Sequence, residues 1–377
     1  MVRVFVNQLP FYVIKSTDID YVKKLQSISK ELNSTFYYPS NIFWGWKENL
    51  CAIINKLFSM LGFRLKIRYT YPKKNLGKAF KHNTFDVVYS QGIIPVDIAD
   101  TPVFLETTFW IPGQNSKATN DGETLFNKKA VPYMQQVLNR NCIINLKSNC
   151  EINNVLKYYP DSTDKLVSIP FLLPDLKPIS KEALYKKHKN DKTLKILFVG
   201  GQANRKGLPF LIKAFCQFKD KYRHIKTELH IVSGYTDGKI AIPKGYDIVE
   251  HGKLPHNETQ KLFQQCHIFV MVSTRESYGL VYIEAMANGC VVIARDFYPQ
   301  REILNEGTLG LFAKPEDIVS IETALEKACT LSQNERLDMA LRALEKFKTV
   351  YSFNVVAPKY TKVFQKLANN NHNYGIS

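Results

Sequence analysis

The chain has 377 residues, 45% of them hydrophobic, and a formal net charge of +17 at pH 7. This length suits two domains of about 150–200 residues each, and the hydrophobic fraction excludes a disordered chain. No stretch of about 18 apolar residues occurs, which excludes a membrane-spanning helix. The positive charge predicts an anionic partner, such as nucleic acid, acidic lipid headgroups or a phosphorylated substrate.

The seven cysteines are scattered and include no Cys-x-x-Cys pair. An odd, scattered set favours neither a disulfide framework nor a zinc site, and it is typical of a reducing compartment. We therefore expect a cytoplasmic protein. The N-terminal sequence MVRVFVNQLPFYV alternates apolar residues and lacks a small-residue cleavage site, so we interpret it as a first β-strand and not as a signal peptide.

The first half of the chain alternates short apolar runs with amphipathic stretches. The runs predict strands at Val2–Asn7, Asp86–Ser90, Val103–Glu106, Cys142–Leu146 and Leu166–Ile169. Apolar residues at helical spacing predict helices near Asp20–Leu32, Trp46–Met60 and Leu125–Leu138. Such an alternation indicates an α/β domain.

A basic segment lies within this half. Residues 49–85 contain no Asp or Glu but carry eight cations, namely Lys56, Arg64, Lys66, Arg68, Lys73, Lys74, Lys78 and Lys81. With Trp44 and Trp46 just upstream, such a basic amphipathic segment can lie on an anionic membrane. The alternative is an ordinary core helix with a solvated basic rim. We expect no nucleic-acid partner, because no recognised nucleic-acid-binding module accompanies the charge.

The second half of the chain is more regular. Pro170–Lys192 contains three prolines and many lysines, which predicts a hinge between two lobes. Beyond it, apolar runs predict strands buried on both faces of a parallel sheet, at Leu194–Gly201, Thr227–Gly234, His267–Ser273 and Cys290–Asp296. A helical pattern at Gly207–Tyr222 between the first two strands is typical of a doubly wound α/β fold. A last helix is predicted at about Pro358–Leu367, before an Asn-rich tail.

Two loops of this half each join a predicted strand to a predicted helix. The first, Phe198–Gly207 (FVGGQANRKG), brings Arg205 and Lys206 to a helix N-terminus, where free amides can bind an anion. The second, Arg275–Ala285 (RESYGLVYIEA), holds Glu276 and Glu284 with seven residues between them. The alternative is that these are ordinary solvated charges.

The carboxyl ends of parallel strands meet at one edge of a sheet, so both loops are expected to line the same crevice. Helix N-termini and cations suit a diphosphate, whereas carboxylates suit hydroxyl groups. A ligand with both a diphosphate and sugars is a nucleotide-sugar, and this is the expected ligand.

Three segments carry a family resemblance. FVGGQANRKGLPFLIKAF, STRESYGLVYIEAMANGCVVIARDFYPQREIL and EGTLGLFAKPED resemble the C-terminal lobe of family 4 glycosyltransferases, whose signature is a Glu, seven residues and a second Glu. The resemblance covers about Lys195–Asp317. It implies the GT-B fold, an α/β architecture of two Rossmann-like doubly wound domains that face a central cleft.

The resemblance also implies the domain organisation. An acceptor-side domain is expected at residues 1–172, a hinge at 173–192 and the nucleotide-sugar-binding domain at 193–352. Residues 353–377 would form a C-terminal helix that can cross back to the first domain, followed by a frayed tail.

The matching positions imply roles in a donor site. Glu276 would bind hydroxyl groups of the donor sugar and Glu284 those of the ribose, while Lys206 and Arg205 would neutralise the departing diphosphate. Glu276, Lys206 and Arg205 are therefore the predicted catalytic residues. Further donor contacts are expected from Gly200, Gly201, Tyr278, Gly279 and Leu280, with the base near Lys253 in the strand and turn EHGKLP.

The sequence departs from the family pattern at several positions. Gly201 stands where many relatives carry Arg, and Arg205 beside Lys206 can supply that charge instead. The stretch FLETTFW at Phe104–Trp110 has no histidine where relatives often carry one. No catalytic residue of the first domain is assigned: Glu106 in this stretch is a candidate, but a buried structural role is the favoured interpretation.

Asp18 and Asp20 form an Asp-x-Asp pair, which binds a metal in a different glycosyltransferase fold. Here the pair precedes a predicted amphipathic helix, where Asp commonly caps the N-terminus. We expect capping and no metal site.

We therefore expect a retaining, metal-independent, hexosyltransferase-type glycosyltransferase of polysaccharide, glycan or glycolipid synthesis. It would move a sugar from a nucleotide diphosphate sugar, such as a UDP-sugar, to a hydroxyl of a glycan or lipid-linked acceptor, without a cofactor. The alternatives are a non-catalytic nucleotide-sugar-binding protein and an epimerase or phosphorylase of the same fold. The expected location is the cytoplasm, with peripheral binding to the inner face of the membrane if the basic segment binds lipid.

Overall fold

The computed structural model describes residues 1–7, 25–37, 85–91, 100–106, 135, 137–190, 193–236, 238–276 and 278–373. The chain divides into two compact units, of which the first comprises the described residues up to Ile169 and those from Ala357 onward. The second unit is Pro170–Val356. The basic segment at residues 49–84, the Asp18 and Asp20 pair, the helix expected at Trp46–Met60 and most of that at Leu125–Leu138 lie outside the described residues.

The first unit contains a sheet in which all paired strands are parallel. Its order is β2-β1-β3-β4-β5-β6. The strands are β1 (Val2–Asn7), β2 (Ser34–Tyr37), β3 (Val87–Gln91), β4 (Val103–Glu106), β5 (Cys142–Asn145) and β6 (Leu166–Val167). Five of these strands were predicted from the sequence within two residues at each end. β2 was not predicted, because its sequence STFY contains no continuous apolar run.

Two short helices follow β5, namely α5 (Asn149–Leu156) and the 3₁₀ helix η1 (Pro160–Lys165). Ser148 caps α5, because its side chain accepts a hydrogen bond from the backbone N–H of Glu151 at 3.2 Å. Neither helix was predicted from the sequence.

The C-terminal helix α13 (Phe353–Asn373) starts five residues before its predicted start at Pro358. Pro358 is tolerated because the carbonyl that loses its helical donor belongs to Asn354, an exposed residue that water can reach. From Ala357 onward the helix belongs to the first unit. Phe364 packs against Phe36 and Phe104, with ring centroids 5.7 and 5.6 Å apart, so the helix completes the core on the sheet.

The second unit has a parallel sheet of order β12-β11-β10-β7-β8-β9. Its strands are β7 (Leu194–Val199), β8 (Thr227–Val232), β9 (Ile248–Gly252), β10 (Ile268–Met271), β11 (Val291–Arg295) and β12 (Gly310–Ala313). The four strands predicted here are confirmed, although each ends one or two residues early because the glycines and polar residues at its carboxyl end leave the sheet to form loops.

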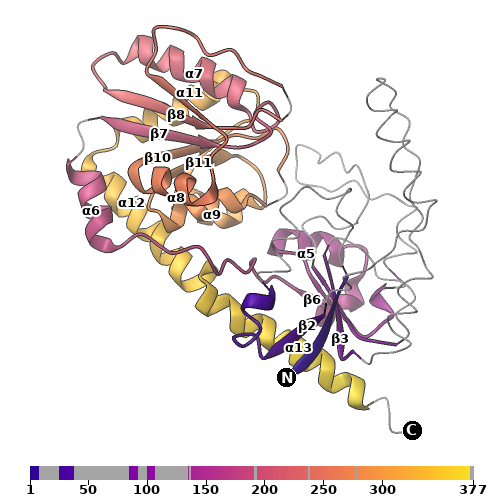
Figure 1. Ribbon diagram of the computed structural model, residues 1–377. Coiled ribbons are helices and arrows are strands. Elements are labelled where there is room, and N and C mark those ends of the chain that lie inside the picture. Colours follow the sequence, from indigo (N-terminus) through magenta and orange to yellow (C-terminus); the bar gives the residue numbers. More distant parts are fainter. Residues whose placement is uncertain are drawn as a thin grey trace, which may run out of the picture. The chain divides into compact units, whose positions relative to one another are not determined.

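Helices cover both faces of this sheet (Figure 1). α7 (Leu208–Lys221) and α11 (Ile318–Thr330) lie on one face, and α8 (His256–Gln265), α9 (Leu280–Ala287) and α12 (Gln333–Lys346) on the other. The short α10 (Gln300–Ile303), the 3₁₀ turn η2 (Asn305–Gly307) and the π-helix η3 (Phe347–Tyr351) complete the unit.

Part of the expected hinge is a helix, α6 (Lys181–Asn190). Its Leu184 is fully buried in the core of the second unit. The ammonium group of Lys187, also buried, donates hydrogen bonds to the carbonyls of Asn288 at 2.9 Å and Phe263 at 3.0 Å. These residues fix α6 to the second unit.

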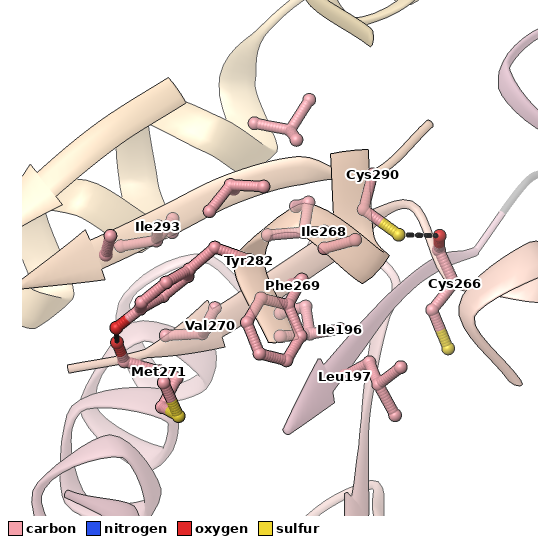
Figure 2. Close-up of a cluster of buried hydrophobic side chains, with 14 of the residues drawn as sticks. Ile196, Leu197, Cys266, Ile268, Phe269, Val270, Met271, Tyr282, Cys290 and Ile293 are labelled. Atoms are coloured by element: carbon pink, nitrogen blue, oxygen red, sulfur yellow. Dashed lines mark hydrogen bonds between the residues drawn. The ribbon is translucent and has the colours of Figure 1, made fainter. Parts of the chain in front are cut away.

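The core between β10, β11 and α9 is shown in Figure 2. Tyr282 of α9 is fully buried, and its hydroxyl donates to the carbonyl of Met271, the last residue of β10, at 2.7 Å. Cys290 donates from its thiol to the carbonyl of Cys266 at 3.2 Å. α9 is thereby held at the carboxyl end of β10.

The six described cysteines are free thiols, four of them buried. Among the described helices, none combines the length and the hydropathy that crossing a bilayer requires.

Candidate functional site

The second sheet changes direction between β7 and β10. These strands are paired in parallel, yet the chain continues from β7 to β8 and β9 on one side and from β10 to β11 and β12 on the other. The loops after β7 and β10 therefore diverge at the carboxyl edge of the sheet. Open α/β sheets bind their ligands in the crevice at such a point. These are the two loops that were predicted from the sequence to line one crevice.

Gly207 brings these two loops into contact. Its φ is +83°, and a Cβ atom at this position would lie 2.2 Å from the carbonyl oxygen of Val272, the residue after β10. Next to it, the carbonyl of Arg205 accepts hydrogen bonds from the backbone N–H of Thr274 at 2.9 Å and from its hydroxyl at 3.1 Å. The start of α7 is therefore fixed against the end of β10.

The joined loops place Lys206 and Glu276 together. Their side chains form an ion pair and are 16% and 9% exposed. A Cβ atom at Gly200 would lie 3.0 Å from Cγ of Lys206, so the stem of the lysine passes over this glycine. Two of the three predicted catalytic residues, 70 positions apart in the chain, are thus in direct contact.

Arg205 connects the two loops by its side chain as well. Its Nε donates to Oε1 of Gln202 at 2.6 Å within the β7 loop, and its guanidinium donates to the carbonyl of Arg275 in the β10 loop. The residue is half-buried. The guanidinium thus holds the chain at the residue before Glu276.

The N-terminus of α9 forms the far side of the β10 loop. Gly279 is its N-cap with φ +91°, where a Cβ atom would lie 2.4 Å from the ring of Tyr282. Leu280 is the first helical residue, so the amides at this end point out of the helix and can bind an anion.

Tyr278 is buried and packs edge-on against Phe171, with ring centroids 5.5 Å apart. Burial raises the pKa of its hydroxyl well above the ordinary value. Gln300 donates to its carbonyl at 3.0 Å. The ring and the carbonyl of Tyr278 are therefore both engaged within the second unit.

Glu284 lies in the second turn of α9 and is half-buried. Its carbonyl accepts from the backbone and the side chain of Asn288 at 3.2 and 2.8 Å. Glu276 precedes the helix and Glu284 lies inside it, so the two carboxylates occupy different places along the β10 loop and α9.

Lys253 follows β9 and is exposed. Its stem lies along Gly234 in the loop after β8, because a Cβ atom there would be 3.6 Å from Cβ of Lys253. Tyr235 in the same loop donates to the carboxylate of Glu250 in β9. Thr236 donates to the carbonyl of Gly201 at 2.8 Å from its N–H and at 3.0 Å from its hydroxyl. The loops after β7, β8 and β9 are thereby linked at one edge of the sheet.

Two residues of this edge were not predicted. Arg295, the last residue of β11, is buried and donates to the carbonyl of Thr274 at 3.1 Å. The run CVVIARD places Arg295 next to the last residue of a predicted strand, which is a usable signal, but only tertiary contacts show that its side chain turns toward the β10 loop. Thr274 gives no comparable signal.

Glu106 of the first unit is 2% exposed. Its carboxylate forms an ion pair with Lys147 and accepts from the hydroxyls of Tyr89 and Tyr360, all of them buried. Burial holds the pKa of Lys147 well below its usual value. A carboxylate enclosed by these groups agrees with the structural interpretation of Glu106.

Residues 180–346, all within the second unit, match the model of the glycosyl transferases group 1 family. An uncharacterized glycosyltransferase of Methanocaldococcus jannaschii is 24% identical over 270 residues, which cover 66% of this chain and 72% of that protein. The N,N'-diacetylbacillosaminyl-diphospho-undecaprenol alpha-1,3-N-acetylgalactosaminyltransferase of Campylobacter jejuni is 24% identical over 196 residues, 50% of this chain and about half (49%) of that protein.

Among solved structures, a glycosyltransferase from Rickettsia africae superposes with a TM-score of 0.67 over 98% of each chain, at 14% identity. This likeness shows the fold, and the two parallel six-stranded sheets with flanking helices are those of the GT-B architecture. Together with the match at residues 180–346 in the second unit, it supports a family 4-type glycosyltransferase with a two-domain GT-B fold.

Proposed function

We propose that this enzyme transfers a sugar from a nucleoside diphosphate sugar to an acceptor hydroxyl, with retention of the anomeric configuration and without a metal ion. The observation that carries the proposal is the ion pair of Lys206 and Glu276 between the loops after β7 and β10. A cation and a carboxylate at the same point suit the two chemically different parts of such a donor, its phosphates and its sugar hydroxyls.

Charge stabilisation is assigned to the protein itself. Lys206 and Arg205 would bind the diphosphate, and their interaction would strengthen as charge develops on the leaving oxygen. The amides around Gly279 and Leu280 at the N-terminus of α9 would add hydrogen bonds to donor oxygens. When the donor binds, the carboxylate of Glu276 would leave Lys206 and accept a hydrogen bond from a hydroxyl of the donor sugar.

The nucleoside is assigned to the neighbouring loops. Glu284 would accept hydrogen bonds from the ribose hydroxyls, and the base would lie beside the chain at Gly234 and Lys253, where Lys253 packs its stem. In transfer, the bond from the anomeric carbon to the phosphate oxygen breaks and a bond to the acceptor oxygen forms on the same face. The acceptor proton goes to the departing diphosphate.

The acceptor is proposed to be lipid-linked or a glycan. The relative from Campylobacter jejuni has a diphospho-undecaprenol acceptor in its name, which supports a lipid-linked one. Binding of the basic segment at residues 49–85 to an anionic membrane belongs to the same proposal. Sedimentation with anionic but not neutral vesicles, weakening as salt rises, is the expected result. Equal sedimentation with both vesicle types at low salt would contradict it.

The test of the central proposal is a panel of UDP- and GDP-sugars, assayed for thermal stabilisation and then for transfer or donor hydrolysis in EDTA. A bound donor at 100 times its dissociation constant stabilises the fold by about 2.7 kcal/mol. The anomeric configuration of the product is read by NMR. An inverted product contradicts retention, and activity that EDTA removes and manganese restores contradicts metal independence. Stabilisation without turnover favours the non-catalytic alternative.

A further inference from the structure

Arg295 occupies an unusual place for an arginine. It is the last residue of β11, which pairs in parallel with β10 up to Ala294 beside Met271. Its side chain is buried although the residue ends a strand at the ligand-binding edge of the sheet. Burying a guanidinium is costly unless the surrounding groups compensate for lost water.

Few groups compensate for it among the described residues. One guanidinium nitrogen donates to the carbonyl of Thr274 at 3.1 Å, and the cation stacks on the ring of Phe297, 4.3 Å from its centroid. Nε is buried without a hydrogen-bond acceptor in the described part of the chain. The cost of burial lowers the pKa of Arg295, while the nearby charge of Glu276 favours its charged form.

The hydrogen bonds of Arg295 continue into the β7 loop. Thr274, which accepts from Arg295, donates its N–H and hydroxyl to the carbonyl of Arg205. Arg205 in turn donates from its guanidinium to the carbonyl of Arg275. One chain of contacts thus runs from β11 through residues 274–275 to the loop after β7, and Glu276 is the next residue along it.

From this chain of contacts we infer that Arg295 is a positioning residue, which fixes residues 274–276 so that the carboxylate of Glu276 faces the donor sugar. The inference rests on the proposed function for the identity of the ligand. The ordering of the loop itself does not depend on that identity, because every contact in the chain joins groups of the protein.

The experiment compares Arg295→Met with Arg336→Met. Arg336 of α12 is a matched control, because it is also buried, donates to a carbonyl, that of Leu331, and has a buried Nε without an acceptor among the described residues. Both variants lose a buried guanidinium, so both are expected to lose stability. Arg295→Lys keeps the charge and a hydrogen-bond donor, so it should restore part of the stability that Arg295→Met loses.

The first measurement is amide hydrogen exchange of the ligand-free chain. Arg295→Met should speed exchange at residues 272–276 about tenfold or more relative to the wild type, while Arg336→Met leaves this segment unchanged. Equal exchange there in the two variants would overturn the inference, whatever the chain binds.

The second measurement is calorimetry with UDP and UDP-glucose, or with GDP and GDP-mannose if the wild type prefers them. Arg295→Met should raise the dissociation constant of the nucleotide-sugar about tenfold and change that of the free nucleotide by less than about threefold. The double variant with Glu276→Ala should lose little more affinity for the nucleotide-sugar than Glu276→Ala alone, because both changes remove the contact of Glu276 with the donor sugar. Losses of binding free energy that add up in the double variant would overturn the inference. Faster exchange in a chain whose wild type binds no nucleotide-sugar would contradict the proposed function and leave the positioning of the loop established.

Discussion

Lys206 and Glu276 neutralise each other between the loops that follow β7 and β10. The pair is only partly exposed, so each charge has lost most of its water and depends on the other. A donor that enters this site must offer an anion to the lysine and hydroxyl groups to the glutamate.

Replacing Lys206 tests its assignment to the diphosphate. Lys206→Ala should reduce kcat/KM by about tenfold to a hundredfold or more, because a hydrogen bond to a charged group is worth about 1.5–3 kcal/mol. Arg205→Ala should have a smaller effect in the same direction. Steady-state transfer assays measure both, with Lys327→Ala on the exposed side of α11 as the control. Equal activity of the Lys206 and Lys327 variants would contradict the assignment.

Lys346 shows why such a control needs the structure. In the sequence it resembles a solvated lysine near a helix end, but its ammonium donates to the carbonyl of Glu302 at 2.7 Å. Burial lowers the pKa of Lys346. Its replacement would disturb packing and would obscure the comparison.

The two glutamates should differ in the ligand that they affect. Glu284→Ala should weaken the binding of free UDP and of UDP-glucose equally, because ribose is present in both. Glu276→Gln should weaken binding of the nucleotide-sugar by about tenfold. It should not weaken binding of free UDP, because Lys206 no longer has to break an ion pair with Glu276 before it binds the diphosphate. Isothermal titration calorimetry separates the two patterns. The same loss of UDP affinity in both variants would show that the roles are not divided in this way.

Gly207→Ala should disrupt the site by moving α7 away from β10. The added Cβ atom would lie 2.2 Å from the carbonyl oxygen of Val272, in a backbone conformation that is itself unfavourable for alanine. We expect a loss of more than about 2 kcal/mol in unfolding free energy and a loss of nucleotide binding. Gly245→Ala is the control, because its φ is +86° but no atom lies within 4 Å of the added Cβ. Urea denaturation that gives equal losses would show that backbone strain, and not the contact, decides the effect.

Acid should destabilise the second unit through two buried histidines. His267 accepts from the N–H of Lys195 at 3.1 Å and bonds the carbonyl of Lys187 at 2.9 Å, which describes a neutral ring. Burial, together with the charge of Lys187, lowers the pKa of His267 to about 4 and that of His188 to about 3. In the unfolded chain both pKa values return to about 6.5.

Between about pH 6.5 and pH 4 the unfolded chain therefore binds protons that the folded chain does not. The free energy of unfolding should fall as pH falls through this range, by up to about 1.4 kcal/mol per pH unit for each histidine. Urea denaturation at several pH values measures the slope. His188→Gln should flatten it, whereas replacing the exposed His224 should not. A wild-type stability that is constant over this range would contradict the prediction.

Apolar runs and the residues that interrupt them were enough to predict the parallel sheets and the two loops of the site. Strands buried on both faces, such as Val291–Arg295, appear as continuous apolar runs, and a glycine or polar residue marks where each ends. Since parallel strands end at one edge, the residues that follow them can be predicted to lie together before any contact is known. This is why Lys206 and Glu276 could be assigned to one site.

The contacts that those residues make depend on tertiary packing and could not be predicted from the sequence. No spacing rule shows that Lys206 pairs with Glu276, that Arg295 turns under Thr274, or that Glu106 is enclosed by Lys147 and two tyrosines. These contacts join residues far apart in sequence, and they depend on how loops and α13 pack. Local periodicity reports which face of an element is buried, but a side chain at the end of a strand can turn either to solvent or to a neighbouring loop, and packing alone selects between them.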